Sequence, residues 1–127
     1  RYGGSLIPPG GTVRLWCLST HALANGLMDM TVLWRNVRDL PTGQQSQAWI
    51  DNFGIKMAHT LDGFEAMVDE LACQPLGLGQ ITAGIVLSYL DFRFAHAPWR
   101  AGRPRLAAWH ESFAARPSMR ATEIAAS

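Results

Sequence analysis

The sequence has few of the residues that build disulfide frameworks, zinc sites or redox motifs. Only two cysteines, Cys17 and Cys73, occur in 127 residues, and they do not form a CxxC spacing. Two cysteines are too few for a disulfide scaffold, and their separation excludes the paired spacing of zinc and redox motifs. We expect both to be buried as small hydrophobic side chains.

Motifs for metal binding and catalysis are also absent from the sequence. The histidines show no HxxxH or HExxH spacing, so we expect them to be surface residues or hydrogen-bonded polar residues; they are His21, His59, His96 and His110. No serine lies in a GxSxG setting, which removes support for a hydrolase triad. Residues 10–12 are not followed by the GK[ST] of a phosphate-binding loop. The sequence predicts no metal site and no catalytic residue.

Charge is scarce and balanced. Charged residues make up 17% of the chain and leave a formal net charge of +1, with both signs interspersed. A nucleic-acid-binding protein usually carries a strong basic surface, so we expect no nucleic-acid partner. Apolar residues make up 48% of the chain, which excludes a disordered tail and favours one domain with one core.

No hydrophobic run has the character of a membrane span. The longest stretch without a charged side chain includes residues 72–90, but prolines, glycines and polar residues interrupt it. No basic segment followed by an apolar one, as in a signal peptide, occurs near Arg1. We therefore expect a soluble protein that lies in the cytoplasm and does not contact a membrane.

What the sequence does contain is helical spacing along most of its length. Residues 1–11 are rich in glycine and proline and are interpreted as the remnant of an interdomain linker. Apolar residues three and four apart then predict helices from Thr12 to about Pro41, over 50–71, over 78–94 and from Pro104 to about 113. The third of these is apolar nearly all round, which predicts a central position. Strand-like alternation is missing, so residues 12–127 are predicted to form one all-α domain.

The first predicted helix carries a second stripe, which includes the small residues Ala22 and Gly26, on another side. We predict from it that this helix packs on two sides. The stripe comprises Leu15, Leu18, Ala22, Gly26 and Leu33.

Three segments near the C-terminus resemble the last helices of bacterial glutathione transferases. They are YLDFRF at 89–94, WRAGRPRLAAW at 99–109 and FAARPS at 113–118. Upstream, ALANGLMD at 22–29 and KMAHTLDGFE at 56–65 are similar to the first two helices of the C-terminal domain in that family, and RYGGSLIP at 1–8 is similar to the end of the domain before it. The resemblance implies an orthogonal or up-and-down bundle of about five helices, like the glutathione transferase C-terminal domain. It also places Asp91, Arg93 and Trp109 in the structural motif of the last helices.

In that family the helix that carries YLDFR opens with a Ser or Thr cap and an Asp three residues later. Here Gly77 and Gln80 occupy these places. Glycine is an acceptable N-cap and glutamine still reaches back, so we expect a weakened capping box. On this basis, Gly77→Ser is expected to stabilise the chain by roughly 0.5 kcal/mol.

The resemblance implies a function that this chain does not complete. In glutathione transferases the thiol-activating residue and the glutathione site lie in a thioredoxin-like domain, and none of its motifs is present here. The helical domain of the family supplies the apolar wall of the electrophile site and part of the homodimer interface. We therefore expect a parent that conjugates glutathione, as co-substrate, to small apolar electrophiles, and an inactive isolated chain without a cofactor of its own. The alternative is a non-catalytic module for dimerisation or for binding a hydrophobic ligand.

Six residues of the first helix are candidates for the substrate cleft: Ala22, Gly26, Leu27, Asp29, Met30 and Leu33. Apolar walls with few polar groups are typical of small-molecule sites, although core packing is the alternative for Leu27, Met30 and Leu33. A lone buried carboxylate is costly, so we expect Asp29 either to form an ion pair or a helix cap, with Arg93 or Arg35 as partner, or to line the cleft near glutathione.

Four arginines surround Trp99 in the sequence. This pattern fits either an anion-binding surface with an aromatic platform or, by the resemblance, a loop that locks the last two helices together. The four are Arg93, Arg100, Arg103 and Arg105.

Overall fold

The computed structural model describes residues 4–123 and shows an all-helical bundle over that range. Its elements are α1 (Gly11–Arg38), the short 3-10 helix η1 (Thr42–Gln44), α2 (Gln47–Ala66), α3 (Val68–Cys73), α4 (Leu78–Arg93), α5 (Pro104–Ala114) and α6 (Pro117–Ala121). The predicted all-α class is confirmed. The described residues hold six α-helices, where the apolar spacing predicted four and the resemblance implied about five.

The extra helices arise in two places that the sequence left continuous or unassigned. The predicted helix over 50–71 is wrong in one respect, because it is broken at Met67, whose backbone leaves the helical region. Asp69 and Glu70 then lie in the first turn of α3, where acidic side chains favour a helix N-terminus. The break lets α3 pack against α5, whereas α2 packs against α1. The second extra helix is α6, in a segment to which the apolar spacing assigned no helix.

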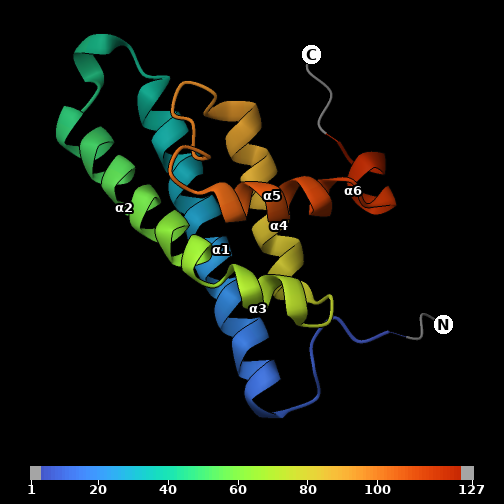
Figure 1. The fold of residues 1–127 in the computed structure, drawn as a ribbon. Coiled ribbons are helices and arrows are strands. Elements are labelled where there is room, and N and C mark those ends of the chain that lie inside the picture. The colour runs from blue at the N-terminus through green and yellow to red at the C-terminus, as the bar shows by residue number, and fades with distance from the viewer. Residues whose placement is uncertain (1–3, 124–127) are drawn as a thin grey trace.

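Helix α1 lies between α2 and α4, and α5 crosses the bundle in front of them (Figure 1). The buried side of α1 only partly matches the apolar residues that predicted this helix. Thr20, Leu27 and Trp34 of that row are buried, whereas Val13 and Leu23 are exposed. The buried row is made mostly of small residues. It comprises Cys17, Thr20, Ala24, Leu27, Thr31 and Trp34.

Small residues on α4 explain why α1 and α5 approach it so closely. A Cβ atom at Gly79 would lie 2.9 Å from the carbonyl oxygen of Cys17 on α1. A Cβ atom at Gly84 would lie 2.3 Å from the ring of Phe113 on α5. Both distances are shorter than atoms tolerate, so each glycine makes room for a neighbouring helix.

Helix α4 supplies much of the core. The sequence predicted that it would be covered on all sides, but it is not. Val86, Leu87 and Leu90 are fully buried. Ile85, on another side of the helix, is 46% exposed. The apolar surface of α4 therefore exceeds what the described residues cover.

The start of α4 confirms one half of the expected capping box. The side-chain Oε1 of Gln80 accepts a hydrogen bond from the backbone N–H of Gly77 at 3.0 Å. The carbonyl oxygen of Leu6 accepts from the N–H of Leu78 at 2.8 Å, so the segment before α1 caps α4. A Cβ atom at Gly77 would lie 2.8 Å from that same oxygen. The prediction that Gly77→Ser stabilises the chain is therefore wrong, because the added side chain has no room.

The predicted linker at 1–11 lies partly outside the described residues. Residues 4–10 form no regular helix, and α1 begins at Gly11. The division into linker and domain stays a prediction. The cysteine prediction holds for Cys17, which is 2% exposed, and is wrong for Cys73, which is exposed at the end of α3.

Candidate functional site

Most of the predicted cleft residues form one exposed row on α1. Ala22, Gly26, Asp29 and Leu33 follow one another at steps of four, three and four, which places them on one face of a helix. All four are exposed, and Leu33 is 54% exposed. Leu15 continues the row and is 66% exposed. We call these five residues the open face of α1. Helix α1 does pack on two sides, against α4 and α2, but within the described residues most of the second stripe lies on neither side.

The other two candidates do not lie on the open face. Leu27 is 2% exposed and belongs to the hydrophobic core, so the alternative of core packing applies to it. Met30 is half-buried against the same core. Leu18 of the second stripe is also half-buried.

Asp29 has no arginine partner among residues 4–123. The structure gives Arg35 an ion pair with Asp39 at 3.9 Å instead. Arg93 places its guanidinium over the ring of Phe92, 4.2 Å from the centroid. The predicted ion pair of Asp29 is therefore wrong. Its side chain is exposed, so its carboxylate avoids the cost of burial that motivated the pairing.

A polar network that the sequence did not predict joins α4 to α5 around a buried histidine. His110 is 3% exposed, and its Nε2 lies 3.0 Å from Oγ of Ser88. Its Nδ1 lies 3.1 Å from a guanidinium nitrogen of Arg100. Asp91 accepts from the same guanidinium at 2.9 Å and from the indole N–H of Trp99 at 2.7 Å. The only sequence signal was the spacing of Ser88 and Asp91 on one face of α4.

The order Ser88, His110, Asp91 is similar to a hydrolase triad, but the proton positions are reversed. Arginine only donates, so Nδ1 of His110 must accept and Nε2 carries the hydrogen. Nε2 then donates toward Ser88 and cannot take its proton, as a general base must. Burial lowers the pKa of His110 below its ordinary 6.5; nearby Asp91 opposes this, and Arg100 adds to it. The network therefore fastens two helices and does not activate a nucleophile.

Three of the four arginines near Trp99 form ion pairs with helices of the bundle. Arg100 pairs with Asp91 of α4 and also contacts His110 of α5, so the locking of these two helices is confirmed for Arg100. Arg103 pairs with Asp62 of α2 at 2.7 Å, and Arg105 pairs with Asp69 of α3. These two arginines hold the start of α5 to other helices than the predicted one.

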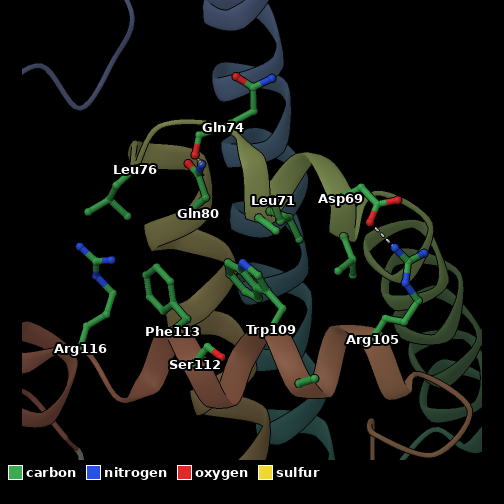
Figure 2. Close-up of a pocket in the computed structure, with 13 residues that line it drawn as sticks. Asp69, Leu71, Gln74, Leu76, Gln80, Arg105, Trp109, Ser112, Phe113 and Arg116 are labelled. Atoms are coloured by element: carbon green, nitrogen blue, oxygen red, sulfur yellow. Dashed lines mark hydrogen bonds and ion pairs between the residues drawn. The ribbon is translucent and has the colours of Figure 1, made fainter.

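A groove of about 640 Å³ lies between α3 and α5. Figure 2 shows Trp109 and Phe113 of α5 facing Leu71 of α3 and Leu76 of the following loop. Arg116 stands at one end of the groove, and the ion pair of Asp69 with Arg105 stands at the other. Trp109, predicted only as part of a structural motif, thus lines a pocket.

Two further features are absent from the described residues. No group of three or more metal-binding side chains occurs among residues 4–123. No helix within this range is long and apolar enough to span a membrane.

The sequence profile of the glutathione S-transferase C-terminal domain matches residues 47–112, which is more than half of the chain. The chain belongs to this family. The resemblance seen in the sequence is therefore confirmed.

Solved structures of other glutathione transferases share the fold of this transferase C-terminal domain. A family member from Pseudomonas fluorescens Pf-5, solved with bound S-(propanoic acid)-glutathione, is 36% identical and has a TM-score of 0.94. The match covers 99% of this chain and 65% of that one. A glutathione S-transferase from Methylobacillus flagellatus, with glutathione bound, is 26% identical with a TM-score of 0.87; the match covers 94% of this chain and 61% of that one.

A third relative extends the comparison to Methylobacterium radiotolerans. Its glutathione S-transferase, in complex with glutathione sulfonate, is 28% identical with a TM-score of 0.83, over 96% of this chain and 59% of that one. The transferase C-terminal domain described here thus spans about 59–65% of the length of these solved relatives. A search of curated proteins found no match.

Proposed function

We propose that this chain is the helical part of a glutathione transferase whose open face of α1 forms part of the electrophile site. One observation carries the proposal. In a chain of this family, the row of Leu15, Ala22, Gly26 and Leu33 is apolar and exposed, with two small residues at its centre. Exposed apolar patches mark binding surfaces, and small residues let a substrate or another domain approach the helix closely.

The activity proposed for the parent is conjugation of glutathione to small apolar electrophiles. The solved relatives hold glutathione or a derivative of it, and about a third of their length has no counterpart in this chain. We assign the glutathione site and the thiol-activating residue to a thioredoxin-like domain in that remaining part. On this proposal the present chain is inactive alone, and Asp29 lies at the polar edge of the electrophile cleft near glutathione.

We further propose that the parent is a homodimer and lies in the cytoplasm. Trp49 and Ile55 of α2 are 59% and 58% exposed, so apolar surface remains on a helix other than α1. A second copy would remove such surface from water. Cys17 and Cys73 are both free thiols, which persist in a reducing compartment.

The test compares the full-length parent with the 127-residue chain in the conjugation of glutathione to 1-chloro-2,4-dinitrobenzene. We expect turnover by the parent and none by the chain. In the parent, Leu33→Arg should raise KM for the electrophile and leave KM for glutathione near its original value. Leu40→Arg is the matched control, since Leu40 is also exposed but follows α1. Equal effects of Leu33→Arg on both KM values would count against an electrophile wall on this face.

The alternative is a module that binds a hydrophobic ligand or dimerises without catalysis. The groove between α3 and α5 favours it, because its apolar lining belongs to this chain alone. A parent that contains no domain beyond this one, and that dimerises in light scattering without conjugating glutathione, would select the alternative.

A further inference from the structure

The α3–α5 groove plays no part in the proposed conjugation. No residue of α1 lines it, so it is separate from the open face. Its apolar lining comes from two sides. Trp109 and Phe113 lie on α5 with their rings 5.1 Å apart at an angle of 26°, and Leu71 and Leu76 lie opposite (Figure 2). Phe113 is buried and stacks on Trp109, so the half-buried indole of Trp109 is the aromatic surface left for another flat ring.

Charge in the groove is concentrated at one end. Arg105 is neutralised by Asp69, whereas Arg116 has no acidic partner among residues 4–123. The guanidinium of Arg116 lies over the ring of Phe113, 5.8 Å from its centroid. The charged lining residues are Asp69, Arg105 and Arg116, so the groove carries one uncompensated positive charge, beside the aromatic surface. An arginine in this position matches a planar carboxylate.

Gln80, which also lines the groove, is engaged within the protein and is not free for a ligand. Gln80 accepts from Gly77 and donates to the carbonyl oxygens of Gln74 and Pro75 at 3.2 and 2.9 Å. The Asp69–Arg105 pair bounds the end of the groove away from Arg116 (Figure 2). A groove bounded at one end suits a small molecule better than a peptide, which needs an exit at both ends. Its volume of about 640 Å³ falls in the range of small-molecule sites.

We propose that the α3–α5 groove binds a small aromatic carboxylate. The ring lies on the indole of Trp109, opposite Leu76, and the carboxylate accepts hydrogen bonds from Arg116. The chemistry of this site does not involve glutathione, so the proposal stands apart from the conjugating activity.

The experiment titrates the 127-residue chain with 2-naphthoate by calorimetry and maps the contacts by NMR of the ¹⁵N-labelled protein. We expect saturable binding, with the largest shifts at the indole N–H of Trp109 and the amide of Ser112. Arg116→Gln should weaken binding about tenfold, the size of one charge-assisted interaction. Arg120→Gln, on the same helical segment but outside this groove, is the control and should leave the affinity unchanged.

A neutral probe separates charge recognition from apolar packing. 2-Naphthalenemethanol should bind more weakly than 2-naphthoate and should not respond to Arg116→Gln. Leu76→Asp changes a loop residue that is 38% exposed, so it should fold, and it should weaken 2-naphthoate more than the alcohol.

Several results would overturn the proposal. They are an absence of saturable binding, shifts that centre on the open face of α1, or equal losses for Arg116→Gln and Arg120→Gln. Sedimentation that shows a dimer broken by Leu76→Asp would assign the groove to a second copy of the chain instead.

Discussion

The region around α5 and the open face of α1 differ in how many of their side chains find partners within the domain. Around α5, three arginines reach α4, α2 and α3, and Glu65 of α2 accepts from the backbone N–H groups of Arg105 and Leu106. On the open face of α1, apolar and small side chains are exposed, and Asp29 has no ionic partner in the described range. We call these regions the locked side and the open side.

The difference teaches which surfaces the chain completes by itself. On the locked side, the orphan N–H groups at the start of α5 and the buried ring of His110 find partners within residues 4–123. On the open side, leucines stay exposed although the helix beneath them is well packed. Stability should therefore depend on the locked side, and the open side should tolerate substitution until another surface covers it.

The largest expected effect is the contrast between truncating a buried leucine of α4 and truncating an exposed leucine of α1. Leu87 of α4 is fully buried and Leu33 of α1 is 54% exposed. Leu87→Ala should lower the free energy of unfolding by about 2–5 kcal/mol, because it leaves a cavity. Leu33→Ala should change it by less than about 0.5 kcal/mol. Urea denaturation of both variants measures this contrast. Similar losses would contradict the conclusion that the open side contributes little to stability.

Gly77→Ser should destabilise the chain by about 1–3 kcal/mol, because its Cβ atom would press against the carbonyl oxygen of Leu6. Gly77→Ala is the matched control, since it adds the same atom without a hydroxyl. Thermal melting of the two variants separates the effects. A higher melting midpoint for the serine variant than for the original chain would restore the simple capping argument.

Glu65→Gln should lower the free energy of unfolding by about 1 kcal/mol, since it weakens a charged cap on the α5 N-terminus. Glu70→Gln serves as the control, because the exposed Glu70 side chain contacts no other helix terminus within residues 4–123. Denaturation midpoints compare the two. If both variants lose the same amount, the cap contributes nothing specific.

The smallest effect is a dependence of stability on pH. Burial lowers the pKa of His110, so the unfolded chain takes up a proton below pH 6.5 while the folded chain still resists it. The stability that comes from keeping His110 neutral is fully present above pH 6.5. It is lost as the pH falls from 6.5 toward the lower pKa of the folded chain. His110→Gln should flatten the stability profile between pH 7.5 and 5. An unchanged slope would show that the histidine is not held neutral by the fold.

The positions of the helices were largely predictable, because apolar spacing, Pro41, Pro75 and Pro104 mark them locally. The break at Met67 was not predictable, because no glycine or proline occupies that position. It accompanies the packing of α3 on α5, which no local pattern shows. The open face was recognised as a stripe, but its exposure was not, since spacing alone does not say which side of a helix finds a neighbour.

The sequence by itself determined the helical class, the family and the half-box at Gln80, because these depend on short-range patterns. Only the tertiary structure decided that Asp29 has no arginine beside it, that Gly77 has no room for a side chain, and that His110 meets Ser88 and Arg100. Such contacts join residues far apart in the chain. Their geometry is set by how closely whole helices pack, which no local spacing encodes.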